Sequence, residues 1–180
     1  MERLTADDEY VVSVDIGCQP SPSGSAETII QMERTTLVVF HAISSKLSAD
    51  GCYDNLDFAL VECVGCCRTL FGYPNDEGLP EHPLYDKGLS EIPEVAEVIN
   101  SSWAAALGDQ MDASTWRIRG QYDKAFQMPQ GGKRLRDWRH FIFQFKENTF
   151  ECIADELRVI SVGKPYEKIM DEVSRRISGG

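Results

Sequence analysis

Three cysteines lie close together in one short segment, Cys63-Val64-Gly65-Cys66-Cys67. A C-x-x-C turn with glycine near its second cysteine can aim two thiolates at one Zn²⁺ ion, and a tetrahedral site needs two further ligands. No second C-x-x-C is present, so those ligands would come from the remaining cysteines and histidines: Cys18, Cys52, Cys152, His41, His82 and His140. Alternatively the thiols are buried, as free cysteines usually are, and an extended segment would place Cys66 on the opposite face from Cys63 and Cys67. Zinc at Cys63, Cys66 and Cys67 is therefore an option, and we commit to no cofactor.

A second set of side chains could perform acid–base or nucleophilic chemistry. His41 and His140 are candidate bases, Asp155 is a candidate carboxylate beside His140, and Cys63 is a candidate nucleophile. The proline-rich stretch 72–87 adds further ionisable side chains: Asp76, Glu77, Glu81, His82 and Asp86. Each has a plainer interpretation, since a histidine at a strand end can bond to backbone and an acidic loop can simply be solvated. We therefore commit to no catalytic residue and lean towards a protein that is not an enzyme.

Motifs of the common enzyme classes are absent from the sequence. It contains no G-x-S-x-G, P-loop, H-E-x-x-H or G-x-G-x-x-G pattern, which argues against the common hydrolases, NTPases, zincins and dinucleotide enzymes.

The chain ends in Gly179-Gly180, the kind of tail that ubiquitin-like modifiers and sulfur carriers present for activation. Because glycine directly after a helix is also the ordinary C-cap, we assign this tail no role.

The clearest structural pattern is a β-hairpin within 138–160. Phe141, Phe143 and Phe145 alternate with less apolar residues, and a second run begins at Thr149. With Glu147-Asn148 as a two-residue loop, Phe145 faces Phe150, and one face is apolar on both strands. The other face would then place His140 opposite Asp155, next to Arg139. That end of the hairpin is the one part of it with potential chemistry.

The remaining elements predict an α+β fold. Strands are expected at 10–16, 37–43 and 56–71, with a bend or bulge at Gly65. Amphipathic helices are expected at 90–107 and 165–177. Strands with short connections favour a mainly antiparallel sheet with two amphipathic helices, and the alternative is a β-sandwich or barrel with peripheral helices. We expect a single domain over 1–180, with mobile loops near 18–27 and 109–136.

The charge of the chain limits its partners. The formal net charge is −11 at a pI of about 4.7, which disfavours binding to nucleic acid or to anionic membranes. The sequence shows no membrane-spanning run and no signal peptide, so we expect a cytoplasmic protein. One basic stretch, 117–139, holds seven Lys and Arg residues against two Asp. It either lies across the acidic body of its own chain or forms an anion site.

Three functional hypotheses follow. The first is a non-enzymatic binding or protein-interaction module for a basic partner, which would use the acidic body or the groove beside 72–87. The second is a zinc- or thiol-based domain built on Cys63, Cys66 and Cys67. The third is an unusual enzyme with a His, Cys and acid site, which requires those side chains to converge in a concave pocket. The oligomeric state is not predicted.

Three segments resemble a family of small bacterial proteins of about this length. They are FGYPNDEG at 71–78, NSSW at 100–103 and HFIFQFKENTFECIA at 140–154, and the likeness extends over 37–154. The resemblance implies a bacterial, cytoplasmic, single-domain protein. It implies no activity and no site residues.

Overall fold

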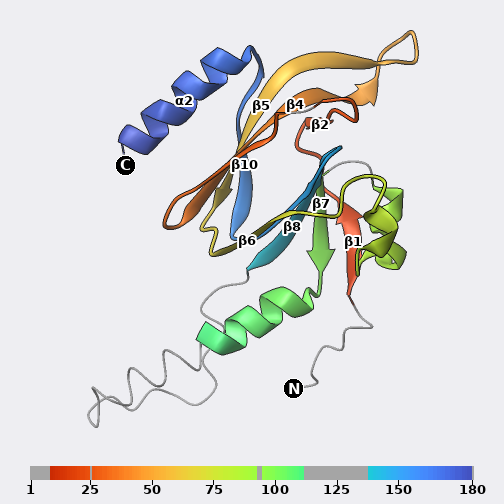
Figure 1. Cartoon of the computed structure of the whole chain (residues 1–180), viewed down its shortest axis with the longest axis vertical. Helices are drawn as coiled ribbons and strands as arrows, with labels where there is room; N and C mark the ends of the chain where they lie inside the picture. The colour runs from red at the N-terminus through yellow and green to blue at the C-terminus, as the bar shows by residue number, and fades with distance from the viewer. Residues whose placement is uncertain (1–8, 25, 93–94, 112–137, 180) are drawn as a thin grey trace.

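Two antiparallel β-sheets form the body of the computed structural model (Figure 1), which describes residues 9–24, 26–92, 95–111 and 138–179. The first sheet has the strand order β1 (Tyr10–Ser13), β7 (Val95–Ile99), β8 (Arg139–Gln144), β9 (Thr149–Ala154) and β6 (Arg68–Gly72). The second has the order β10 (Glu156–Lys164), β5 (Tyr53–Val64), β4 (Thr35–Leu47) and β2 (Cys18–Pro20), and β3 (Thr28–Gln31) also pairs with β4. We call them sheet A and sheet B.

The main core lies between the two sheets. Alternation along the strands sends Phe141 and Phe143 from sheet A, and Phe40 and Val61 from sheet B, into one fully buried cluster. Phe40 and Phe143 meet edge to face at 6.1 Å between ring centroids. The burial of these apolar side chains between the sheets is the dominant stabilising contribution to such a fold.

Each sheet also has a covered outer face. Helix α2 (Tyr166–Ser178) lies along sheet B (Figure 1). Its Ile169 and Val173 pack onto Leu37, Val39 and Leu60 of that sheet. On sheet A, the outer face is covered by three short 3₁₀ turns, η2 (Leu79–Glu81), η3 (Tyr85–Lys87) and η4 (Leu89–Glu91). Their apolar side chains, Leu84 and Leu89, pack with residues of β1, β7 and β8. Helix α1 (102–111) follows β7.

The predicted α+β class with mainly antiparallel strands is confirmed. The strands divide into two facing sheets, and within the described residues neither sheet closes into a barrel. The predicted helix at 165–177 is present as α2, with Pro165 at its N-cap. Of the loops predicted to be mobile, Cys18–Pro20 form β2 and pair with β4. Residues 112–136, with most of the basic stretch, lie outside the described residues.

The predicted helix at 90–107 is wrong. Residues Val95–Ile99 form β7, and the helix begins only at 102, after Asn100 with φ +57°. Val95 faces the core between the sheets, whereas Ala96 and Val98 face the η turns. A strand buried on both faces is apolar at consecutive positions, so its pattern does not distinguish it from a helix.

The predicted hairpin forms, but in a different register. Phe143 pairs with Phe150 and Gln144 with Thr149, so the connection has four residues, 145–148, and the N–H of Phe145 donates to the carbonyl of Asn148 at 2.9 Å. His140 therefore lies opposite Ile153, and the predicted pairing with Asp155 is wrong. The shift is two residues, which leaves every side chain on its predicted face. The apolar pattern determined the face and could not determine the loop length.

Candidate functional site

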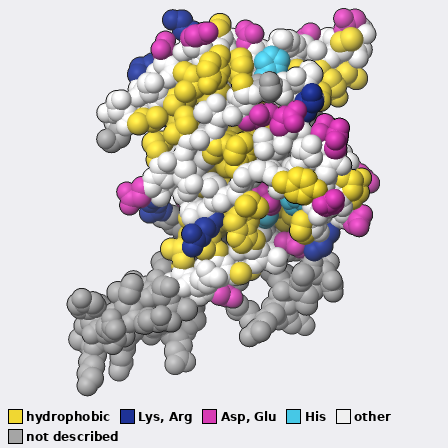
Figure 2. Space-filling model, in the orientation of Figure 1, with side chains coloured by type: hydrophobic (Ala, Val, Ile, Leu, Met, Phe, Trp, Pro, Cys, Tyr) yellow, Lys and Arg dark blue, Asp and Glu magenta, His cyan; other side chains and the backbone are white. Residues whose placement is uncertain are grey.

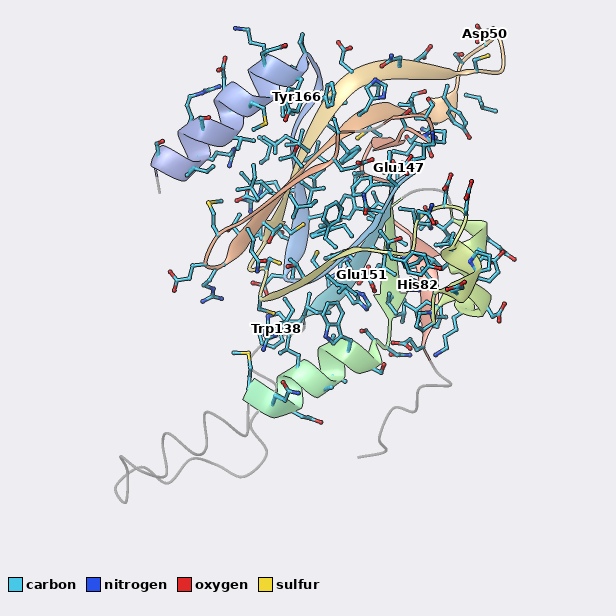
Figure 3. All side chains as sticks on the ribbon, in the orientation of Figure 1. Asp50, His82, Trp138, Glu147, Glu151 and Tyr166 are labelled. Carbon is cyan, nitrogen blue, oxygen red and sulfur yellow. The ribbon has the colours of Figure 1, made fainter. Side chains whose placement is uncertain are left out.

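A chain of buried hydrogen bonds crosses the outer face of sheet A. Ser101 Oγ lies 2.9 Å from His140 Nδ1, and His140 Nε2 lies 2.8 Å from Glu151 Oε2. The second carboxylate oxygen, Oε1, lies 3.4 Å from Nε2 of His82. Glu151 and His82 lie near each other in Figure 3. The four residues come from the start of α1, from β8, from β9 and from the turn between η2 and η3.

A single assignment of protons gives every polar group of this hydrogen-bond network a partner. The N–H of Leu84 donates to His82 Nδ1 at 3.1 Å, so His82 carries its proton on Nε2 and donates it to Glu151. His140 likewise donates from Nε2 to Glu151 and accepts the Ser101 hydroxyl at Nδ1. Burial raises the pKa of the Glu151 carboxyl, but the hydrogen bonds that it accepts from His140 and His82 outweigh burial and lower the pKa to about 2. Glu151 is therefore a buried carboxylate held as an anion.

The hydrogen-bond network contains the residue types of a nucleophilic triad. Its geometry, however, favours a structural role. Ser101 Oγ accepts the N–H of Ala104 at 3.1 Å and so caps helix α1. The Ser101 residue is only 7% exposed, and the ring of Trp103 packs edge-on against His140 at 5.0 Å. A buried serine that is engaged as a helix cap is poorly placed to attack a substrate. The hydrogen-bond network instead joins helix α1, strands β8 and β9, and the η turns.

The sequence prediction found part of this site. It named His140 and His82 but assigned Asp155 as the partner of His140, and it missed Ser101 and Glu151. Asp155 instead lies where β9 ends, with Oδ2 2.0 Å from the position that a Cβ on Gly65 would occupy. Glu151 could have been found from the sequence, because positions 151, 153 and 155 all share the face of His140 in any register that keeps the phenylalanines together.

His41 lies far from this network in the fold. It belongs to β4 and shares the outer side of sheet B with Leu37 and Val39, and its ring meets Phe58 at 5.4 Å. Its Nδ1 is buried and has no hydrogen-bond partner in the part of the chain that the structure describes. Cys63 lies between the sheets, so His41, Cys63 and His140 occupy three different layers. The proposed convergence of these residues does not occur in the structure.

The cysteines of the C-x-x-C segment face the core. The chain turns at Gly65, with φ +66°, so Cys63 and Cys66 both join Cys152 in the buried cluster between the sheets. A hydrogen bond from Cys152, opposed by burial, lowers the pKa of Cys66 to about 7. Burial is the main cause that raises the pKa of Cys67 to about 11. Among the described residues, no group of three or more His, Cys, Asp or Glu side chains is arranged to hold a metal ion.

A second feature is the surface formed by residues 72–92, which we call the acidic segment. It exposes five carboxylates: Asp76, Glu77, Glu81, Asp86 and Glu91. Within the described residues none of these five makes an ion pair, whereas Lys87 bonds to Glu9 at 3.1 Å. The segment has five acids against one lysine, a net charge of −4. Figure 2 shows acidic side chains gathered on the side where the η turns lie.

Exposed apolar residues lie just before the acidic segment and at its start. Leu70 and Phe71 of β6 are 56% and 44% exposed, and Tyr73 is 65% exposed. The Tyr73 hydroxyl donates to Glu81 Oε2 at 2.5 Å, which ties an exposed aromatic ring to one of the five carboxylates. Apolar side chains beside unpaired charges are typical of protein-binding surfaces.

The described residues include a groove beside the acidic segment and a wider hollow along α2. A groove of about 220 Å³ adjoins the start of the acidic segment, where Asn75, Asp76 and Leu79 face Tyr53 and Phe145. A wider hollow of about 600 Å³ lies along α2 between Lys164 and Arg175. The side chains of Lys168, Asp171 and Arg175 there are 71%, 68% and 71% exposed, so this hollow is a solvated helix face. Of these two concave regions, the groove adjoins the acidic segment.

Comparisons with protein-family models, with curated proteins and with solved structures gave no match for this chain. The resemblance to a bacterial family therefore remains a prediction. No helix in the described residues is long and apolar enough to span a membrane.

Proposed function

We propose that this protein is a non-enzymatic interaction module that holds a basic protein partner on its acidic segment. The observation that carries the proposal is the set of five exposed carboxylates that form no ion pair with any described residue, next to the exposed Leu70, Phe71 and Tyr73. Unpaired surface charge of one sign attracts a partner of the opposite sign and increases its rate of association. The apolar residues add contact area that charge alone does not supply.

The acidic segment is held firmly on sheet A. Leu84 and Leu89 pack into the outer core of that sheet, and His82 bonds to the buried Glu151. Gly88 approaches β1 so closely that a Cβ on it would lie 3.0 Å from the carbonyl oxygen of Val11. A surface that is already ordered loses less conformational entropy when it binds, which favours affinity.

The test uses a fluorescent lysine-rich peptide as the basic probe. We expect saturable binding to the wild-type protein that weakens steeply as salt is added, because exposed charges are screened. In the test variant, the five acids of the segment become amides: Asp76→Asn, Glu77→Gln, Glu81→Gln, Asp86→Asn and Glu91→Gln. Amides keep the local hydrogen-bond acceptors while removing charge, so we expect binding about tenfold weaker or more.

A matched control removes the same charge elsewhere. It converts five exposed acids on β5, on α2 and beside β3 to amides: Glu33, Asp54, Asp57, Glu167 and Asp171. If bulk charge alone attracts the probe, the two variants will lose affinity equally and the acidic segment is not the binding surface. Failure of the wild-type protein to bind the peptide at low salt would overturn the proposal.

A further inference from the structure

We infer that the basic partner binds as an extended segment that adds a strand to the free edge of β6, beside the acidic segment. This inference rests on the proposed function and specifies its binding mode. Strand addition supplies main-chain hydrogen bonds for affinity, while alternate side chains of the added strand supply specificity.

The position of β6 in sheet A makes this possible. β6 is the last strand of the sheet and, among the described strands, pairs with β9 alone. Outside that pairing, the side chain of Thr69 donates from Oγ1 to Gln31 Oε1 at 2.7 Å. An edge strand presents unpaired backbone N–H and C=O groups that can bond to another extended chain.

Two of the other sheet edges, β1 and β10, are protected. At β1, the η turns pack closely, as the approach of Gly88 to Val11 shows. At β10, the exposed side chains include Glu156 and Arg158, which bond to each other at 2.5 Å. Charged side chains on an edge discourage strand pairing. β6 has one charged residue, Arg68, followed by Thr69, Leu70 and Phe71.

The side chains of β6 suit an apolar added strand. Leu70 lies opposite Glu151 on the outer side of the sheet, whereas Phe71 lies opposite Phe150 on the inner side. Both sides of the edge therefore offer an exposed apolar contact. The acidic segment begins at Gly72, and within it the Tyr73 hydroxyl bonds to Glu81. The matching partner segment is apolar where it pairs with β6 and carries Lys or Arg where it passes the carboxylates.

Charge favours a different protein over a second copy of this chain as the occupant. Pairing two β6 edges would bring two acidic segments, each of net charge −4, towards one another. Two chains of net charge −11 also repel each other overall. A basic segment experiences attraction at the same edge.

The experiment compares two forms of one synthetic peptide, a valine stretch followed by lysines. In one form, alternate valine amides are N-methylated, which removes hydrogen-bond donors and leaves the charge unchanged. We expect the methylated form to bind the wild-type protein about tenfold more weakly or worse. With the unmethylated peptide, we expect backbone amides of β6 to gain protection from hydrogen exchange, while those of β10 stay unchanged.

Matched variants complete the test. Leu70→Ser should weaken binding, whereas Leu47→Ser, at a 59% exposed position on β4, should not. Equal binding of both peptide forms, together with loss of binding in the five-amide variant, would overturn strand addition and leave the proposed function standing. If the wild-type protein binds neither form of the peptide, strand addition and the proposed function are both overturned. A concentration-dependent dimer abolished by Leu70→Ser would show that a second copy occupies the edge and would also overturn the inference.

Discussion

His140 Nε2 and Glu151 Oε2 lie 2.8 Å apart and join neighbouring strands β8 and β9 diagonally across sheet A. Glu151 is opposite Ile142 in the ladder, so its side chain reaches His140 along the same face. The other carboxylate oxygen reaches His82, in the segment that carries the exposed acids. One buried anion thus links the sheet to the proposed binding surface.

Replacing Glu151 by Gln should destabilise the protein. The amide nitrogen would face the N–H of His140 or His82, leaving a buried donor without an acceptor, so we expect a loss of about 2–4 kcal/mol in the free energy of unfolding. Chemical denaturation measures it, and Glu147→Gln, at an exposed position, should change little. Hydrogen exchange should also increase at Leu84 and Leu89. Unchanged stability would show that the network does not fix the acidic segment.

Stability should fall in acid in a way that depends on Glu151. Its pKa is lowered from 4.5 to about 2 in the folded protein, so its contribution is complete above pH 4.5 and is lost as the pH falls through 2. Integrated over that range the contribution is about 3 kcal/mol. Denaturation curves measured across this range should therefore lose more stability in the wild-type protein than in Glu151→Gln. Parallel pH profiles of the two proteins would contradict this assignment.

Ser101 should matter as a helix cap rather than as a nucleophile. Ser101→Ala removes the acceptor for the Ala104 N–H and the donor for His140 Nδ1, so we expect about 1–3 kcal/mol of destabilisation. Ser101→Thr keeps a hydroxyl and should retain most of the stability. Urea denaturation distinguishes the two variants. Covalent labelling of Ser101 by a fluorophosphonate, absent in Ser101→Ala, would instead show a nucleophilic site.

Thiol reactivity should follow exposure rather than acidity. Cys66 has a pKa of about 7 but is 1% exposed, whereas Cys52 is exposed. Since an alkylating reagent must reach the sulfur, we expect iodoacetamide at neutral pH to modify Cys52 about a hundredfold faster than Cys66. Mass spectrometry of the digested protein gives the site. Comparable rates at the two cysteines would show that the core between the sheets opens readily.

Much of the hairpin could be predicted from the sequence, and its register could not. The alternation of Phe141 and Phe143 gave the strand and its buried face correctly. A two-residue shift keeps that face, so a two-residue loop and the observed four-residue loop fit the same apolar pattern. That shift moved Glu151 to within reach of His140 and removed Asp155 from it.

The interpretation of 90–107 as a helix failed because burial on both sides removes the period-2 signal. Val95 is buried by sheet B, and Ala96 and Val98 are buried on the opposite face by the η turns. Both faces of the strand are therefore apolar. The start of α1 was consequently placed too early, and Ser101 was assigned to a helix interior instead of its cap.

The sequence by itself determined the α+β class, the phenylalanine core face, the final helix and the acidity of 72–92, because each depends on local periodicity or composition. The tertiary structure decided which strands face each other, that the C-x-x-C thiols are buried, and that His82, His140, Glu151 and Ser101 meet. Those outcomes depend on contacts between residues far apart in the chain, which local patterns do not encode. The position of β6 at the end of sheet A, among the described strands, is likewise a property of sheet order, since a strand becomes an edge only through what pairs beside it.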